Sequence, residues 1–227
     1  MTLKLKLAVA VAALFAASTA VPAADRAGEA TRSQQNAFQW ASISPDLLAT
    51  GDEVYQKAEV YTKDHGSVEM RMDDDSLLTL GPNSQLVIDE FVYSSGADTG
   101  NATLSLGRGV LRMVSGRIGS GRVRIGTPVA TIGIRGTDFI LDTNRPGNLR
   151  VWSKSGTVTV SPSNSDIVFE LVAPSFASCS SASCEIGPSP AEPSFFPIAP
   201  ANPSSIGGEN DPGGPEGEES ESSGGFE

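Results

Sequence analysis

A period of two in the hydrophobic pattern, repeated from Gly51 to Val172, constrains the fold of this chain more than any other feature. In Val68–Met72, for example, Glu69 and Arg71 separate three apolar side chains. Alternation of this kind is typical of β-strands that bury one face and expose the other. Turn-forming segments rich in glycine, proline, asparagine, aspartate and serine separate the runs: Asp64–Gly66, Gly81–Asn83, Gly107–Gly109, Gly119–Gly121, Arg145–Asn148 and Ser155–Gly156.

The pattern predicts about a dozen short strands. No long helical pattern lies between them, which excludes parallel strands joined through helices. We therefore expect residues 51–172 to form one all-β domain, either a two-layer sandwich or a short β-solenoid, with a strand order that the sequence leaves open. Residues 24–50 have a mixed pattern, so they are expected only to lead into this domain.

Charge is distributed unevenly along the chain. Residues 1–154 hold 16 basic and 16 acidic side chains, whereas residues 155–227 hold 11 acidic and no basic ones, which accounts for the net charge of −11. The acidic balance argues against nucleic-acid binding, which requires cations that neutralise phosphates. Glycine, proline and serine make up 29 of the 54 residues from 174 to 227. We therefore expect residues 173–227 to be a disordered acidic tail.

The first 23 residues have the features of an export signal. Two lysines precede an apolar stretch from Leu7 to Ala17, and small residues end the segment. Cleavage is expected near Ala23, with Ala20 as the alternative. An uncleaved anchor is a further alternative, because Leu7–Ala24 is close to the minimum length that crosses a bilayer. After cleavage we expect no membrane span and a periplasmic or secreted location.

Cys179 and Cys184 predict a local disulfide, because an even pair of cysteines in an exported chain can oxidise. Their four-residue spacer differs from a thioredoxin-type Cys-x-x-Cys. No second cysteine pair or nearby histidine completes a zinc site. A short staple is therefore the favoured interpretation.

Four stretches carry a family resemblance. Val68–Ile88 has an aspartate-rich turn and a Gly-Pro-Asn-Ser turn, and Ala102–Arg112 contains Leu-Ser-Leu-Gly-Arg-Gly. Thr127–Phe139 reads Thr-Pro-Val-Ala-Thr-Ile-Gly-Ile-Arg-Gly-Thr-Asp-Phe, and Val151–Val158 follows it. In this order they resemble the FecR domain family, the extracytoplasmic part of regulators in iron-uptake signalling. At Asp75 the chain departs from the glycine that is usual in the family.

The resemblance implies a signalling module that contacts an envelope or membrane protein. A full regulator of this family also carries a cytoplasmic anti-sigma region. The expected export signal leaves no room for one, so that role is not carried over. The signature residues are expected to be structural: Thr127, Pro128, Arg135, Gly136 and Thr137. For Arg135 we expect a structural partner such as a backbone carbonyl or Asp138, with the binding of a carboxylate or phosphate as the alternative.

Five arginines within seventeen residues predict a basic patch for partner binding: Arg108, Arg112, Arg117, Arg122 and Arg124. Arg122 and Arg124 are expected to share one sheet face. The patch could receive an acidic protein surface, an anionic polysaccharide or the acidic tail of the chain itself. A solvated face that discourages edge pairing is the alternative.

No catalytic group is predicted. His65 lies in a turn without a nucleophile partner. Asp73–Asp75 is the strongest metal candidate, but adjacent carboxylates in a turn point in different directions, so a solvated turn is favoured and no metal is expected. We therefore expect a non-enzymatic binding or scaffold module without a cofactor. Envelope glycan binding and a purely structural exported protein are the alternatives.

Overall fold

The computed structural model of the chain describes residues 25–34 and 36–193, and these residues contain sixteen strands and no helix. The predicted all-β fold is confirmed. No helix in the described ranges is long and apolar enough to cross a membrane. The expected signal segment and residues 194–227 of the expected tail lie outside the described residues.

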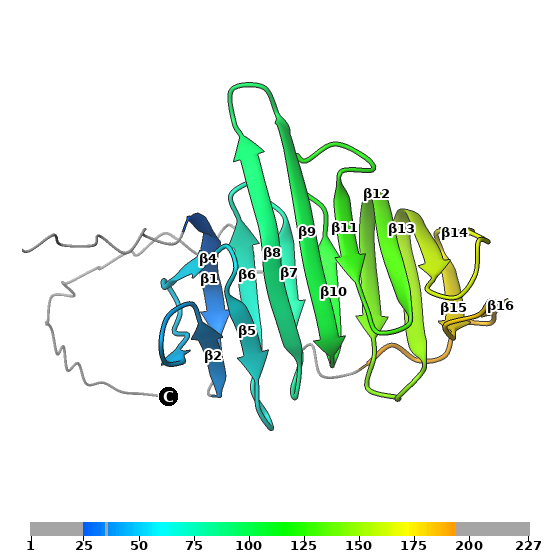
Figure 1. Cartoon of the computed structure of the whole chain (residues 1–227), viewed down its shortest axis with the longest axis horizontal. Coiled ribbons are helices and arrows are strands. Elements are labelled where there is room, and N and C mark those ends of the chain that lie inside the picture. Colours follow the sequence, from blue (N-terminus) through cyan, green and yellow to red (C-terminus); the bar gives the residue numbers. More distant parts are fainter. Residues whose placement is uncertain (1–24, 35, 194–227) are drawn as a thin grey trace, which may run out of the picture. The chain divides into compact units, whose positions relative to one another are not determined.

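All sixteen strands belong to one hydrogen-bonded sheet (Figure 1). In chain order they are β1 (Arg26–Ser33), β2 (Ala37–Trp40), β3 (Asp46–Leu47), β4 (Glu53–Tyr55), β5 (Glu59–Thr62), β6 (Val68–Met72), β7 (Leu77–Leu80), β8 (Gln85–Ser94), β9 (Thr99–Arg108), β10 (Val110–Val114), β11 (Val123–Gly126), β12 (Ala130–Asp142), β13 (Leu149–Pro162), β14 (Phe169–Val172), β15 (Ser175–Cys179) and β16 (Cys184–Gly187).

The sheet turns back on itself at β12, because the two halves of this long strand pair with different neighbours. Residues 131–133 pair with β11, whereas residues 138–142 pair with β10. One layer therefore runs β3-β2-β5-β8-β9-β11 to the first half of β12, and the other runs β4-β1-β6-β7-β10 to its second half. Hereafter the layer that contains β11 is layer A, and the layer that contains β10 is layer B.

Strand β13 divides between the layers in the same way. Its second half pairs with β14 and extends layer A, and its first half pairs with β15 and extends layer B. Strands β14 and β16 therefore end the two layers, on the side that Figure 1 shows in yellow and orange.

Both long strands bend at the same place. The bend of β12 lies at Gly136, within Thr127–Phe139, hereafter the signature segment, and the bend of β13 lies at Gly156. Pairing between β12 and β13 shifts there, from Arg135 opposite Thr157 to Asp138 opposite Ser155. Gly136 and Gly156 have positive φ angles of 59° and 70°, which glycine adopts without a steric penalty. A Cβ on Gly156 would lie only 1.9 Å from the carbonyl oxygen of Gly136. The bend therefore depends on two glycines in close contact.

The core lies between the layers and is built from the alternating apolar side chains that the sequence pattern predicts. Strand β6 illustrates this, because Val68, Met70 and Met72 are buried and Arg71 is exposed. Both layers contribute fully buried side chains to one cluster: Val60, Leu86, Leu104, Ile125 and Ile132 from layer A, and Met70, Leu78, Leu111, Leu141 and Val151 from layer B.

The sheet extends beyond the predicted bounds of 51–172 at both ends. The lead-in segment supplies β1, β2 and β3, and β1 pairs with both β4 and β6. Register shifts between Arg26 and Gly28 and between Ala30 and Arg32 break the alternation in β1, which hides the strand from a search for period two. Beyond Val172, the serine-rich β15 pairs with β13 and buries Ala177 and Cys179.

Residues after β16 cover part of the outer face of layer B. Trp152 points outward from β13 but is only 2% exposed, since it packs against Phe176 with ring centroids 5.1 Å apart. Its indole N–H donates to the carbonyl oxygen of Pro190 at 3.2 Å. Lys154 pairs with Glu192 at 2.9 Å. This part of layer B is therefore occupied by the chain's own residues.

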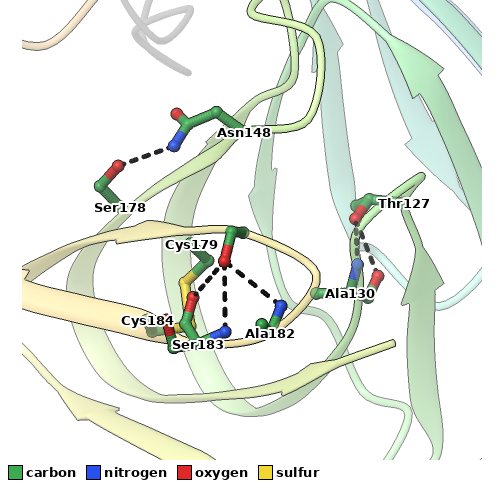
Figure 2. The surroundings of a disulfide bond; sticks show 9 residues. Thr127, Ala130, Asn148, Ser178, Cys179, Ala182, Ser183 and Cys184 are labelled. Atoms are coloured by element: carbon green, nitrogen blue, oxygen red, sulfur yellow. Dashed lines mark hydrogen bonds between the residues drawn. A yellow bond between two sulfur atoms is a disulfide. The ribbon is translucent and has the colours of Figure 1, made fainter. Parts of the chain in front are cut away.

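The predicted disulfide between Cys179 and Cys184 is present (Figure 2). The two cysteines lie opposite each other in the β15–β16 hairpin. In the turn, the hydroxyl oxygen of Ser180 accepts the N–H groups of Ala182 and Ser183, each at 3.2 Å. The disulfide thus closes an already hydrogen-bonded hairpin at the edge of layer B.

Replacing Gly156 with alanine should destabilise the fold by about 3 kcal/mol or more, because the new Cβ meets backbone atoms in addition to the cost of a positive φ. Gly147→Ala is the matched control, since Gly147 has a similar φ of 72° and no atom near the new Cβ. The control should lose only about 1–2 kcal/mol. Urea unfolding of both variants measures the difference, and equal losses would contradict the close-contact argument.

Removal of the disulfide by Cys179→Ser with Cys184→Ser should lower the free energy of unfolding by about 2 kcal/mol, as expected for a very short closed loop. The layers should remain folded, because the hairpin joins the sheet only at its edge. Thermal unfolding and near-ultraviolet circular dichroism test this, and complete loss of tertiary signal would contradict it.

Candidate functional site

The five arginines predicted as one basic patch lie in separate surroundings. Arg112, on β10 in layer B, binds Asp138 through Nε at 3.0 Å and through Nη2 at 2.9 Å. The hydrogen bond to Asp138 is the main reason that the pKa of Arg112 is raised. Arg117 follows β10 and pairs with Asp75 at 2.6 Å. These two arginines are therefore engaged within the fold.

Arg135 does not pair with Asp138, contrary to the partner expected from the sequence. The carboxylate of Asp138 is taken by Arg112, and the backbone N–H of Asp138 donates to the hydroxyl of Ser155. Arg135 is exposed, and within residues 25–34 and 36–193 its side chain has no hydrogen bond or ion pair. Its guanidinium group is available to a ligand.

Arg124 and Arg135 line a groove of about 760 Å³ on the outer face of layer A. Arg124 is also exposed and lacks a polar partner in the described part of the chain. Arg122 is exposed directly before β11 and stands two residues from Arg124. The rest of the groove is mostly small or hydroxyl-bearing and includes Ser120, Thr131, Thr157, Thr159 and Ser161.

Strand register explains the shape of the groove. Across layer A, Arg124 lies opposite Gly133, Gly133 opposite Thr159, and Thr159 opposite Glu170. Gly133 has no side chain, so a gap separates Arg124 from Thr159. The Thr159 hydroxyl donates to the carbonyl oxygen of Gly133 at 3.2 Å, in the space where a Cβ on residue 133 would lie.

The groove continues to an exposed apolar edge at β14. In the described residues, β14 pairs only with β13. Its residue Val172 is 63% exposed, and the preceding Ile167 and Val168 are 61% and 59% exposed. Val172 lies opposite Thr157, which in turn lies opposite Arg135. Aliphatic side chains therefore adjoin the arginine groove.

Arg108 lies at the end of β9, where it lines a second pocket together with Pro128. Thr127 shapes this end of the molecule: its hydroxyl accepts the N–H of Ala130 at 3.1 Å and donates to the carbonyl oxygen of Ala130 at 2.8 Å (Figure 2). These two hydrogen bonds hold the turn between β11 and β12.

The backbone of Thr137 ties the bend to the segment after β10. Its N–H donates to the hydroxyl of Ser115 at 2.8 Å, and its carbonyl oxygen accepts the N–H of Ser115 at 2.9 Å. The side-chain hydroxyl of Thr137 is buried and lacks a hydrogen-bond partner in the described residues. Thr137 therefore holds the bend against the segment after β10 through its backbone.

The aspartate-rich turn between β6 and β7 differs from the solvated turn that the sequence favours. Asp73 and Asp75 are exposed and pair with Arg26 and Arg117. Asp74 is fully buried. No group of metal-binding side chains occurs here or elsewhere in residues 25–34 and 36–193.

Asp74 holds this turn and the distant chain segment after β10. Its carboxylate accepts the N–H of Ser76 at 2.9 Å, the hydroxyl of Ser76 at 2.7 Å and the N–H of Ile118 at 3.2 Å. Its carbonyl oxygen accepts the N–H of Arg117 at 2.8 Å. The next residue, Asp75, has a φ of 65°, which explains why glycine suits that position.

His65 lies in the turn between β5 and β6 with a φ of 60° and is exposed. Asn83 and Asp64 close the neighbouring turns with a side-chain hydrogen bond of 2.7 Å. The side chain of His65 has no hydrogen bond or ion pair within the described residues. Its position is that of a turn residue.

Asp74→Ala should destabilise the protein by about 2–4 kcal/mol, because three buried donors lose their acceptor. Asp73→Ala is the matched control, since the exposed pair with Arg26 is expected to contribute less than about 1 kcal/mol. Guanidinium unfolding measures both. A loss for the control equal to that of Asp74→Ala would contradict the structural role of the buried carboxylate.

Comparisons with known proteins match part of this chain. The model of the family described as FecR protein matches residues 58–159, which include the bend at Gly136 and the groove strands β11 and β12. No curated protein matches the sequence.

Two crystal structures of a protein described as a candidate anti-sigma factor from Parabacteroides distasonis ATCC 8503 also match. Both are 14% identical to this chain, with TM-scores of 0.44 and 0.45. The match covers 56% of this chain and 57% of each of those chains. The chain thus matches little more than half the length of these structures.

Proposed function

From the FecR domain that residues 58–159 form, a domain of a regulatory family, we propose that this chain is a non-enzymatic extracytoplasmic module that binds an envelope protein in signalling. The binding surface in this proposal is the outer face of layer A from β11 to β14. The observation that carries it is the groove in which Arg124 and Arg135 have no partner in the described residues.

The charges of the groove favour an acidic partner. Glu170 is the one acidic residue among its lining residues, against Arg124 and Arg135 inside it and Arg122 beside it. A guanidinium group donates to carboxylates through two parallel N–H groups, so exposed arginines recognise acidic side chains well. Arginine is also enriched at protein interfaces.

The apolar edge favours a protein over other acidic partners. Ile167, Val168 and Val172 expose aliphatic surface next to the groove, and such surface is buried when proteins associate. Strand β14 also presents one side that no described residue pairs with, so an extended segment of the partner could add to the sheet there. A partner with an acidic, strand-forming segment matches both features.

An acidic polysaccharide is the second candidate. The hydroxyl groups of Thr131, Thr157, Thr159 and Ser161 line the groove beside the arginines. Hydroxyl and guanidinium groups together suit a sugar that carries carboxylates. This alternative gives no role to the exposed aliphatic side chains of β14.

An extracytoplasmic location agrees with the disulfide between Cys179 and Cys184, because disulfides persist in oxidising compartments. The expected export signal points the same way. We propose the periplasm as the location, since the proposed partner belongs to the cell envelope.

The charge reversal Arg124→Glu with Arg135→Glu should reduce partner capture from an envelope extract of the source bacterium at least about tenfold, because both partnerless cations are replaced by repelling anions. Lys57→Glu with Lys63→Glu is the matched control, since it makes the same change of charge at two exposed cations outside both the groove and the second pocket. Captured proteins are identified and quantified by mass spectrometry. An equal loss with both double variants would indicate unspecific charge attraction and contradict the proposal.

Val172→Asp should also weaken capture, because it places a charge on the apolar edge. Leu47→Asp is the matched control, since Leu47 is 61% exposed on the short edge strand β3. If polygalacturonate binds wild type but not the groove variant, and Val172→Asp binds it normally, the glycan alternative is supported instead.

A further inference from the structure

A second pocket lies away from the groove, where four turns meet at the ends of the layers. It has a volume of about 490 Å³ and lies between the β7–β8, β9–β10, β11–β12 and β12–β13 connections. The lining residues that matter for its chemistry are Arg108, Pro128, Val129, Asn144, Arg145 and Pro146. Its volume lies within the range that small-molecule ligands occupy.

The pocket is cationic. Arg108 and Arg145 are both exposed, and neither side chain has a hydrogen bond or ion pair within the described ranges. None of the residues that line the pocket is acidic. An anion that enters the pocket therefore meets two arginines whose hydrogen-bonding capacity is unused.

The nearest acidic side chains along the chain are already engaged. Asp142 is 3% exposed, pairs with Arg150 and accepts the backbone N–H of Asn144. Across the neighbouring turns, Asp64 accepts a hydrogen bond from the amide of Asn83 at 2.7 Å. Neither carboxylate forms an ion pair with Arg108 or Arg145.

Hydrogen bonds fix the walls of the pocket before any ligand arrives. The backbone N–H of Thr143 donates to the carbonyl oxygen of Gly109 at 2.9 Å, which joins the β12–β13 turn to the β9–β10 turn. The N–H of Asn148 donates to the carbonyl oxygen of Arg145 at 3.0 Å, and its side-chain amide donates to the hydroxyl of Ser178 at 2.9 Å (Figure 2). A preformed site loses less ordering entropy on binding.

The remaining wall is apolar. Pro128 and Pro146 are exposed on the pocket, and Val129 is 6% exposed. The Thr127 turn fixes the positions of Pro128 and Val129. A ligand that fills the pocket must therefore combine an anionic group with an adjacent apolar group.

We propose that this pocket binds a carboxylate attached to an apolar group, with Arg108 and Arg145 as the residues that hold the carboxylate. The planar guanidinium fork matches the two oxygens of a carboxylate, and the proline and valine wall covers the apolar part. A free organic acid and the C-terminal residue of a peptide share this chemistry. The site is separate from the layer A groove and does not depend on the function proposed for that groove.

Isothermal titration of the exported chain with three probes tests the site: 3-phenylpropanoate as a free acid, acetyl-phenylalanine as a peptide C-terminus, and acetyl-phenylalanine amide as a neutral control. At least one acid should bind about tenfold or more tightly than the amide, because only the acids offer a carboxylate. The tighter of the two acids identifies the source of the ligand. Equal binding of the amide, or no binding of either acid, would overturn the proposal.

Arg108→Gln with Arg145→Gln should reduce the affinity for the acid at least about tenfold. Arg124→Gln with Arg135→Gln is the matched control and should bind as wild type does, since these residues lie in the groove. Thermal unfolding checks that both double variants are folded. If the groove variant instead loses acid binding, or if inorganic phosphate binds as tightly as the acids, the assignment of this pocket is wrong.

Discussion

The close contact of Gly156 with the carbonyl of Gly136 makes the two-layer arrangement possible. Strands β12 and β13 are long enough to run through both layers, and they pair along most of their length. A straight pair of strands would leave one flat sheet whose apolar face is exposed. Because both strands bend at the same place, one face becomes the inside and a single core collects side chains from both layers. The other pairings then only have to extend each layer outward from this shared pair.

Much of this fold could be predicted from the sequence. Three features could not: strand β1, strand β15 and the assignment of strands to layers. Alternation predicted the strands that bury every second residue, such as β6. It failed for β1, whose register shifts interrupt the period. Composition favoured a tail after Val172, yet β15 pairs with β13, and its Phe176 packs against Trp152. The layer assignment required knowing that one strand can pair differently at its two ends, which no local pattern reports.

In the candidate site, too, neighbouring residues predict which way a side chain faces, but not which distant residues it meets. Sequence alternation correctly placed Arg124 on an outer face, because Val123 and Ile125 on either side are buried. Spacing along the chain could not separate Arg112, which belongs to layer B and pairs with Asp138, from the groove arginines in layer A. Nor could it show that Asp74 is buried while its neighbours are solvated. Arg145, twenty-one residues beyond Arg124, was missed for this reason, since only the folded chain brings it to the pocket that contains Arg108.

The signature segment forms the contacts that hold the bend, but the side chain of Arg135 takes part in none of them. The bend requires the backbone freedom of Gly136, and the hydrogen bonds around it use the backbones of Thr137 and Asp138. The ion pair that joins β10 to this strand uses Arg112. Arg135 contributes to none of these contacts, although it lies directly before the bend. A side chain that the fold does not use, held on a rigid strand beside a groove, is well placed to meet a partner. This makes Arg135 the residue at which the family signature meets the proposed binding surface.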